Sequence, residues 1–242
     1  MATSRVILFG ATGMVGQGVR RECVQDREVE AVLEVVRRAS GPSLGRRSEK
    51  ARELVVNDFY DFSGIEDAFA GYDACLFCLG VSSVGMKEAE YRRVTYDITM
   101  AAARAVLRTS ESASQQVSGS GVKQVDGPAG MTFIYVSGAG TDANGRAMWA
   151  RVKGETENAL LGMGFEAAYM FRPGLIVPID GIRSKTGVYR TVYAALRPVL
   201  PLLLRAFPKQ VTTTEQVGRA MLAVAKRGYP KQVLEAADIA SF

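Results

Sequence analysis

Short apolar runs alternate with longer stretches of helical periodicity along most of the chain. The apolar runs predict strands at residues 5–10, 31–38, 53–59, 74–80, 132–138 and 167–177. Helices are expected between them, at residues 14–26, 63–71, 88–108 and 147–163. Strands that are apolar throughout are buried on both faces, and parallel strands need helical crossovers. The pattern therefore predicts an α/β fold, a doubly wound and mostly parallel Rossmann sheet, in a single domain over residues 1–242.

Two segments depart from this alternation. Residues 109–130 are rich in Ser, Gly and Gln, and we expect a flexible surface loop because they bury too little to offset their ordering entropy. After residue 178 the rhythm stops, so residues 178–242 are expected to form a helical cap over the substrate side, by analogy with other Rossmann-type enzymes. Arg and Pro interrupt the apolar residues 192–207, which favours a core or interface helix pair over a membrane-surface element. The stretch 198–204 is compatible with a homodimer surface or with core.

The composition excludes several kinds of chemistry. With no histidine in the chain, a serine–histidine triad, a histidine base and a histidine-based metal site are excluded, and no metal site is predicted. The excess of 30 basic over 25 acidic residues is mild and spread along the chain, so no nucleic-acid partner is expected. No run reaches the roughly 18 apolar residues of a membrane-spanning helix, so no stable membrane insertion is expected.

The chain has three cysteines, an odd number, and no signal-peptide pattern at its first residues. We therefore expect a reducing compartment and a cytoplasmic location. Cys75 and Cys78 form a C-x-x-C, a spacing that redox proteins use. Both lie in the apolar run "ACLFCLG", where residues three apart point to opposite faces of a strand, which favours a structural role.

Three glycines in "GATGMVG" join the first expected strand to the first expected helix. The first N–H groups of a helix have no intrahelical partner and carry partial positive charge, so they attract phosphate. In this arrangement Gly10 permits the tight turn, Gly13 lets the backbone approach a pyrophosphate, and Gly16 lets helix and strand pack closely. The spacing, G-x-x-G-x-x-G, predicts dinucleotide binding, with a purely structural turn as the alternative.

The end of the second expected strand indicates which dinucleotide is bound. NAD-specific sites usually place Asp or Glu there for the ribose 2′-hydroxyl, whereas Arg suits a 2′-phosphate. This chain has Arg37 and Arg38 at that position and no carboxylate close behind them. NADP is therefore the predicted cofactor and NAD the alternative, in which the arginines are solvated strand-end charges.

An ordered set of motifs extends beyond the glycine loop. They are "GATGMVG", "ACLFCLG", "YRRVTYD", "FIYVSGAG", "VKGETE" and "MFRPG". Together they resemble the atypical short-chain dehydrogenase/reductase (SDR) superfamily, and within it the Tat-interacting-protein-like branch and its bacterial relatives labelled NAD-dependent epimerase/dehydratase. The resemblance covers nearly the whole chain except residues 109–130.

The resemblance implies a set of cofactor contacts and two catalytic residues. Ser137 matches the catalytic serine, and Lys153 matches the lysine that holds the nicotinamide ribose and lowers the pKa of a catalytic tyrosine. The resemblance places Thr12, Met14 and Val15 at the phosphates and Asp58 at the adenine side of the cofactor. It places Leu79 and Gly80 at the riboses, and Pro173 and Gly174 at the nicotinamide side.

One position departs from the pattern of this superfamily. Its catalytic helix carries Y-x-x-x-K, and this chain has "WARVK", with Trp149 in place of the tyrosine. Residues four apart share one helix face, so the tyrosine and the lysine of this motif act together. The tyrosine passes a proton to a substrate carbonyl, and the lysine stabilises the phenolate form of the tyrosine. An indole N–H only donates, so Trp149 can hold a substrate oxygen, stack on a ring or line the pocket, but it is no general acid.

Three functions remain open at this point. The first is an NADP-dependent oxidoreductase acting on a small carbonyl or quinone-like substrate, its proton coming from water, Ser137 or another tyrosine such as Tyr169 or Tyr189. The second is a non-catalytic NADP-binding regulator or redox sensor. The third is a nucleotide-sugar-type epimerase or dehydratase, a chemistry that also normally uses the tyrosine.

Overall fold

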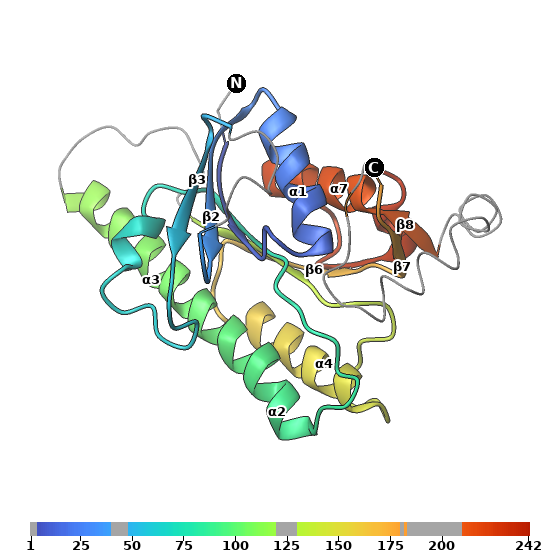
Figure 1. Cartoon of the computed structure of the whole chain (residues 1–242). Coiled ribbons are helices and arrows are strands. Elements are labelled where there is room, and N and C mark those ends of the chain that lie inside the picture. Colours follow the sequence, from blue (N-terminus) through green and yellow to red (C-terminus); the bar gives the residue numbers. More distant parts are fainter. Residues whose placement is uncertain (1–3, 40–47, 120–129, 180–181, 183–209) are drawn as a thin grey trace.

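A parallel sheet forms the centre of the molecule (Figure 1). The computed structural model describes residues 4–39, 48–119, 130–179, 182 and 210–242. Seven strands lie in the order β3-β2-β1-β4-β5-β6-β9, and every neighbouring pair is parallel. They are β1 (Ser4–Phe9), β2 (Val29–Val36), β3 (Ala51–Val55), β4 (Ala74–Phe77), β5 (Thr132–Val136), β6 (Ala167–Arg172) and β9 (Val233–Glu235). The strand order reverses between β1 and β4, which confirms the predicted doubly wound α/β fold.

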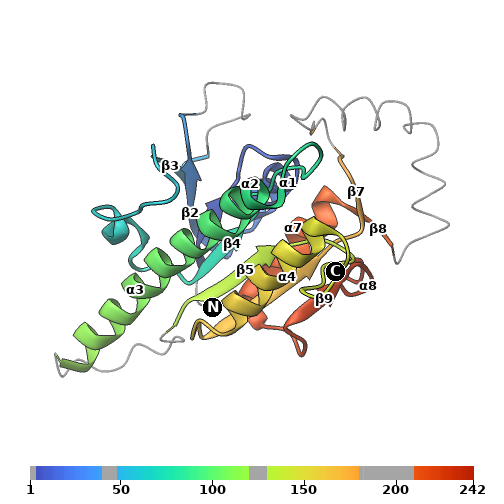
Figure 2. The same cartoon turned by 90° about the horizontal axis from the view of Figure 1, so that it is seen from below.

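Helices cover both faces of the sheet (Figures 1 and 2). One face carries α1 (Met14–Gln25), α7 (Thr214–Arg227) and α8 (Ala236–Ile239), and the other carries α3 (Ile98–Gly119) and α4 (Met148–Leu161). The shorter elements are η2 (Glu66–Phe69), α2 (Glu88–Arg92), the π-helical segment η3 (Arg93–Asp97), β7 (Leu175–Val177) and β8 (Val211–Thr213). None of the helices in the described ranges is both long and apolar enough to cross a membrane.

Each face of the sheet has its own apolar core. Ile7 of β1 packs on the side of α3 and α4, whereas its neighbour Leu8 packs on the side of α1 and α7. The same alternation separates Cys75, which lies in the first core, from Cys78, which packs against the second. Both thiols are free, and burial raises the pKa of each, which disfavours the reactive thiolate. The structural interpretation of the C-x-x-C agrees with this placement.

The described end of the chain, residues 210–242, packs on the sheet and extends it, and the helical cap expected within residues 178–242 stays a prediction. Within residues 178–242, α7 packs against the sheet beside α1, and β9 pairs with β6 to extend the sheet. The apolar face of α7, which includes Val217, Met221 and Val224, is buried against the strands. The three residues of β9 are too few to show a strand pattern in the sequence. Residues 183–209, with Tyr189 and the apolar stretch 198–204, lie outside the described residues.

The helix expected at residues 88–108 is longer than its apolar pattern indicates. In the structure α2, η3 and α3 follow one another without a break, and α3 ends at Gly119. The first part of the expected loop at 109–130 is therefore helical, because Ser, Glu and Gln are tolerated on a helix whose preceding turns are anchored in the core. Residues 120–129 lie outside the described residues.

The packing of α1 on α7 predicts the effect of a β-carbon at Gly18. A Cβ there would lie 2.5 Å from the carbonyl oxygen of Thr214 and 2.8 Å from the Cβ of Thr214, so the helices would have to separate. We expect Gly18→Ala to lower the free energy of unfolding by about 1–3 kcal/mol, measured by urea denaturation. The control is Gly162→Ala, where the nearest atom would be 3.6 Å away. Equal effects of the two variants would contradict the conclusion that the contact between α1 and α7 leaves no room for a β-carbon at Gly18.

Candidate active site

The turn that ends β1 lies against the backbone that leaves β4. Gly10 has φ +83°, a conformation that a side chain disfavours, and a Cβ there would lie 2.8 Å from the backbone of Cys78 and Leu79. These two strand ends are neighbours in the sheet, at the point where the strand order reverses. Ligands of open α/β sheets bind at this point, outside the carboxyl ends of the strands.

The start of α1 lies at this carboxyl edge of the sheet and has no side-chain cap. Within α1 and its N-cap, all described, no cap side chain bonds the first turn and no acidic residue occupies it. Gly13 is the N-cap residue, and its N–H donates to the carbonyl of Gly10 (2.9 Å). A Cβ on Gly16 would overlap the Gly10 carbonyl oxygen, so the helix approaches the turn as closely as the backbone allows. The first N–H groups of α1, from Met14 and Val15 onward, are thus open to an anion.

The other cofactor residues expected from the sequence lie along the same edge of the sheet. Arg37 and Arg38 are exposed directly after β2, and Asp58 is exposed in the loop that follows β3. Asp58 Oδ1 accepts a hydrogen bond from the Tyr60 N–H (2.8 Å), which fixes the loop. Leu79, half-buried, and Gly80, exposed, follow β4. Because β3, β2, β1 and β4 are parallel neighbours, their carboxyl ends align and bring these residues to one rim.

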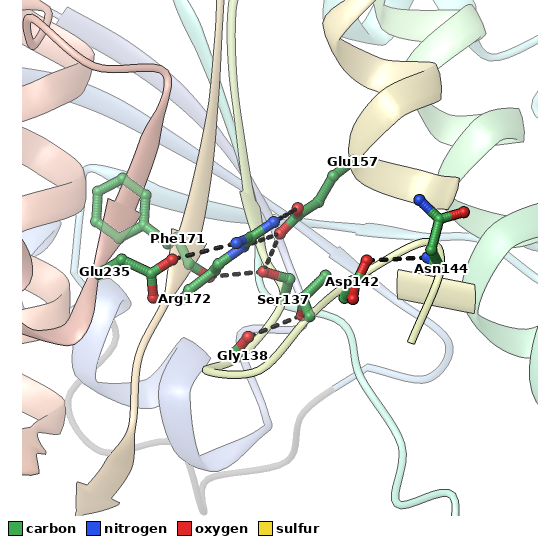
Figure 3. Close-up of polar contacts among 9 residues, drawn as sticks. Ser137, Gly138, Asp142, Asn144, Glu157, Phe171, Arg172 and Glu235 are labelled. Carbon is green, nitrogen blue, oxygen red and sulfur yellow. Dashed lines mark hydrogen bonds and ion pairs between the residues drawn. The ribbon is translucent and has the colours of Figure 1, made fainter. Parts of the chain in front are cut away.

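Ser137 follows β5 and is nearly buried, with 6% of its surface exposed. Its backbone N–H donates to the carbonyl of Phe171 on β6 (2.8 Å). Its hydroxyl lies 2.5 Å from Oε1 of Glu157 and 3.1 Å from the same Phe171 carbonyl (Figure 3). The single hydroxyl proton is therefore directed into the protein, toward Glu157.

Lys153 lies on α4 and reaches the backbone of Ser137. Its Nζ donates to the Ser137 carbonyl oxygen, so the structure brings together the two residues that the sequence assigned to catalysis. Burial lowers the pKa of Lys153 from 10.5 to about 8, and the charge of Glu157, one helical turn further on, opposes this shift. The ammonium is thus charged at neutral pH and titrates in a range useful for proton transfer.

A charged network that the sequence analysis missed holds this site. Glu157 is 2% exposed and binds Arg172 of β6 through two hydrogen bonds, Nε to Oε1 at 3.0 Å and Nη2 to Oε2 at 2.5 Å. Arg172 also donates to Glu235 of β9 (3.1 Å; Figure 3). The hydrogen bonds to Glu157 raise the pKa of Arg172. Both residues lie within recognised motifs, "VKGETE" and "MFRPG", but nothing in their spacing indicates that they pair.

Trp149 and Pro173 border the loop that follows Ser137. Trp149 is half-buried in the first turn of α4, and its ring lies next to Gly140, where a Cβ would be 3.5 Å from the indole Cη2. Pro173 is buried, and its carbonyl accepts a hydrogen bond from the N–H of Ala139 (3.0 Å). The indole therefore packs against this loop, one helical turn before Lys153.

The structure places Tyr169 away from the site. Its hydroxyl accepts a hydrogen bond from the N–H of Tyr229 (3.1 Å), just beyond the end of α7. Tyr169 packs in the core on the α7 side of the sheet, whereas Lys153 and Glu157 approach from α4 on the other side. Tyr169 is therefore not a proton source for a substrate next to Ser137.

Comparison with solved structures gives the class of fold. A short-chain dehydrogenase/reductase from Saccharomyces cerevisiae is 14% identical, with a TM-score of 0.62, and the match covers 99% of each chain. The structure of MoeE5 in complex with UDP-glucose and NAD is 16% identical, with a TM-score of 0.62, covering 98% of this chain and 80% of that one. The chain has the Rossmann fold of NAD(P)-binding SDR and epimerase-type proteins.

Sequence comparison with curated proteins gives particular relatives. Protein HTATIP2 from Rattus norvegicus is 25% identical over 194 residues, covering 77% of this chain and 68% of the rat protein. Protein fmp52, mitochondrial, from Aspergillus niger is 25% identical over 176 residues, covering 72% of this chain and 67% of the relative. No protein-family model matches the chain. The rat protein supports the resemblance to the Tat-interacting-protein-like branch, at a large evolutionary distance.

The relatives correct one expectation from composition. Five of them, all fungal, carry names that place them in mitochondria. The expected cytoplasmic location is therefore wrong on this comparison. The inference failed because reduced cysteines indicate a reducing environment, and such an environment is not confined to the cytoplasm.

The pairing of the buried Glu157 with Arg172 predicts a large effect of Arg172→Met on stability. The variant leaves the Glu157 carboxylate buried without its main partner, and we expect the free energy of unfolding at neutral pH to fall by about 3–5 kcal/mol. Since an unpaired buried carboxylate has a raised pKa, the loss shrinks as the pH falls below that pKa and the folded state takes up a proton.

A matched control shows whether the loss of stability is specific to Arg172 or follows from removing an arginine at any position. Arg108 is exposed and pairs with Glu66 at 3.1 Å, so Arg108→Met is expected to change stability by less than about 1 kcal/mol. Urea denaturation at two pH values measures both variants. Similar losses in the two, or a loss at Arg172 that grows toward acid pH, would contradict the assignment.

Proposed function

We propose that the protein binds NADP(H) in the crevice between β1 and β4 and reduces a small carbonyl or quinone-like substrate with it. The observation that carries the proposal is that the uncapped start of α1 and the Ser137–Lys153 contact lie on the same carboxyl edge of one parallel sheet. The NAD complex of MoeE5, a protein of similar fold, supports dinucleotide binding.

The residues of the glycine loop fit a pyrophosphate. Side chains at Gly10 and Gly16 would collide with neighbouring backbone. A Cβ on Gly13 would have one near neighbour, the Gly10 carbonyl oxygen at 3.3 Å. The other side of Gly13 is thus open for close approach of a ligand to the backbone. Thr12, Met14 and Val15 would contribute the remaining contacts, and Asp58, Leu79, Gly80 and Pro173 would border the adenosine and nicotinamide portions. Bound NADPH supplies a hydride.

Trp149 favours a second candidate function, a non-catalytic NADP-binding regulator or redox sensor. An indole cannot supply the proton that the tyrosine of Y-x-x-x-K supplies.

The pair Arg37 and Arg38 predicts cofactor preference. Replacing both with Ala removes the charge-assisted bonds proposed for the 2′-phosphate, each worth about 1.5–3 kcal/mol. We expect NADPH affinity to fall at least about tenfold per arginine while NADH affinity changes little. Arg27→Ala, an exposed arginine before β2, is the control. Calorimetric titration of both coenzymes tests this, and an unchanged NADPH-to-NADH ratio would refute the NADP assignment.

A coenzyme oxidation assay distinguishes the two candidate functions. Protein is mixed with NADPH and a panel of aldehydes, ketones and quinones, and the loss of NADPH absorbance is followed. The oxidoreductase is expected to turn over a panel member, and Trp149→Phe reports whether the indole N–H contributes. Tight NADPH binding without oxidation, together with activity created by Trp149→Tyr, would establish the regulator instead.

A further inference from the structure

A carbonyl reduction needs a proton for the substrate oxygen, and few described groups of this site can give one. The indole of Trp149 retains its N–H proton. The Ser137 hydroxyl proton is directed to Glu157 at 2.5 Å, so this hydroxyl presents only lone pairs elsewhere. Tyr169 lies on the opposite side of the sheet. Tyr135 is 1% exposed within the core, where burial raises its pKa.

Among the described groups of this site, Lys153 is the one that can donate a proton to the substrate oxygen. Its ammonium carries three protons, and it donates a hydrogen bond to the Ser137 carbonyl oxygen, which directs the group toward the loop after β5. The residue is half-buried, and its ammonium is poorly hydrated. Its pKa of about 8 means that it is protonated at neutral pH and releases a proton readily.

We propose that Lys153 itself donates the proton to the substrate oxygen, in the role that tyrosine has in Y-x-x-x-K proteins, and that Glu157, fixed by Arg172, is the positioning residue that keeps Lys153 charged. This assignment rests on the proposed function. The negative charge of Glu157 lies one helical turn from the ammonium and favours its protonated form. Arg172 holds that carboxylate in place with two hydrogen bonds.

The proposed step balances with the reduced nicotinamide as the two-electron donor. A hydride leaves NADPH and forms a C–H bond at the carbonyl carbon, and the electrons of the C=O π bond move to oxygen. The oxygen takes a proton from Nζ of Lys153, whose N–H bond breaks. The products are an alcohol, NADP⁺ and a neutral amine, which recovers its proton from solvent.

Titratable groups on three elements besides α4 lie near this part of the helix. β6 contributes Arg172, whose guanidinium is hydrogen-bonded to Glu157, and β5 contributes Tyr135, an uncharged phenol. From α2, Glu88 and Arg92 pair with Arg151 and Glu155 of α4 instead. Burial lowers the pKa of Lys153, and Glu157 is the neighbouring charge that opposes this shift.

The first test needs no cofactor turnover. The full-length protein is acetylated with acetic anhydride across a pH series, and modification of each lysine is quantified by peptide mass spectrometry. Lys153 is expected to react with a midpoint near pH 8, whereas Lys231, exposed and paired with Asp238, serves as the internal reference at a higher pH. In Glu157→Gln the Lys153 midpoint should move to lower pH. A Lys153 profile that coincides with that of Lys231 would overturn the proposal.

The second test separates proton donation from cofactor binding. Lys153→Arg keeps a cation but cannot deprotonate, and we expect it to bind NADPH while kcat falls about 10²–10⁴-fold. Trp149→Tyr introduced into Lys153→Arg restores a proton donor and should recover part of kcat. Turnover that survives Lys153→Arg, or a loss confined to KM for NADPH, would overturn this assignment alone. Failure of the native protein to bind either coenzyme would instead overturn the proposed function.

Discussion

The carboxyl edge of the sheet depends on how closely α1 approaches the turn that ends β1. Gly16 lies against the carbonyl of Gly10, and Gly10 lies against the backbone that leaves β4, with no room for a β-carbon at either position. Because nothing separates these backbones, the first turn of α1, which has no side-chain cap, begins at the carboxyl ends of β1 and β4. The ends of β2 and β5 lie on either side of this contact, because β2-β1-β4-β5 are neighbours in the sheet.

A second constraint lies on the opposite side of the sheet. The Glu157 carboxylate is buried and the Arg172 guanidinium partly so, and a charge removed from water is stable only when its hydrogen bonds are satisfied. Here the carboxylate accepts from Arg172 and from Ser137, and the guanidinium continues to Glu235. The network joins α4, the end of β5, β6 and β9. The hydroxyl of Ser137 and the ammonium of Lys153 therefore have defined directions before any ligand binds.

The fold could be predicted in large part because its strands are apolar on both faces and its helices separate them. Six of the seven strands of the sheet overlap predicted apolar runs, although β3 begins two residues before its run and shares only residues 53–55 with it. The exception, β9, has three residues, and its pairing with β6 arises only when α7 returns the chain to the sheet edge. The Ser- and Gln-containing turns of α3 likewise become helical as a continuation of turns already packed on the core.

Sequence alone determined the parts of the site that depend on neighbours along the chain. Glycine spacing defines the turn before α1, and the place of Ser137 after a strand and of Lys153 in a helix follows from local periodicity. Tertiary structure alone decided that Glu157 pairs with Arg172 and accepts a hydrogen bond from the Ser137 hydroxyl, and that Tyr169 packs in the other core. The physical reason is that backbone conformation is coded by adjacent residues, whereas a side chain's charge partner depends on which distant segments the sheet brings together.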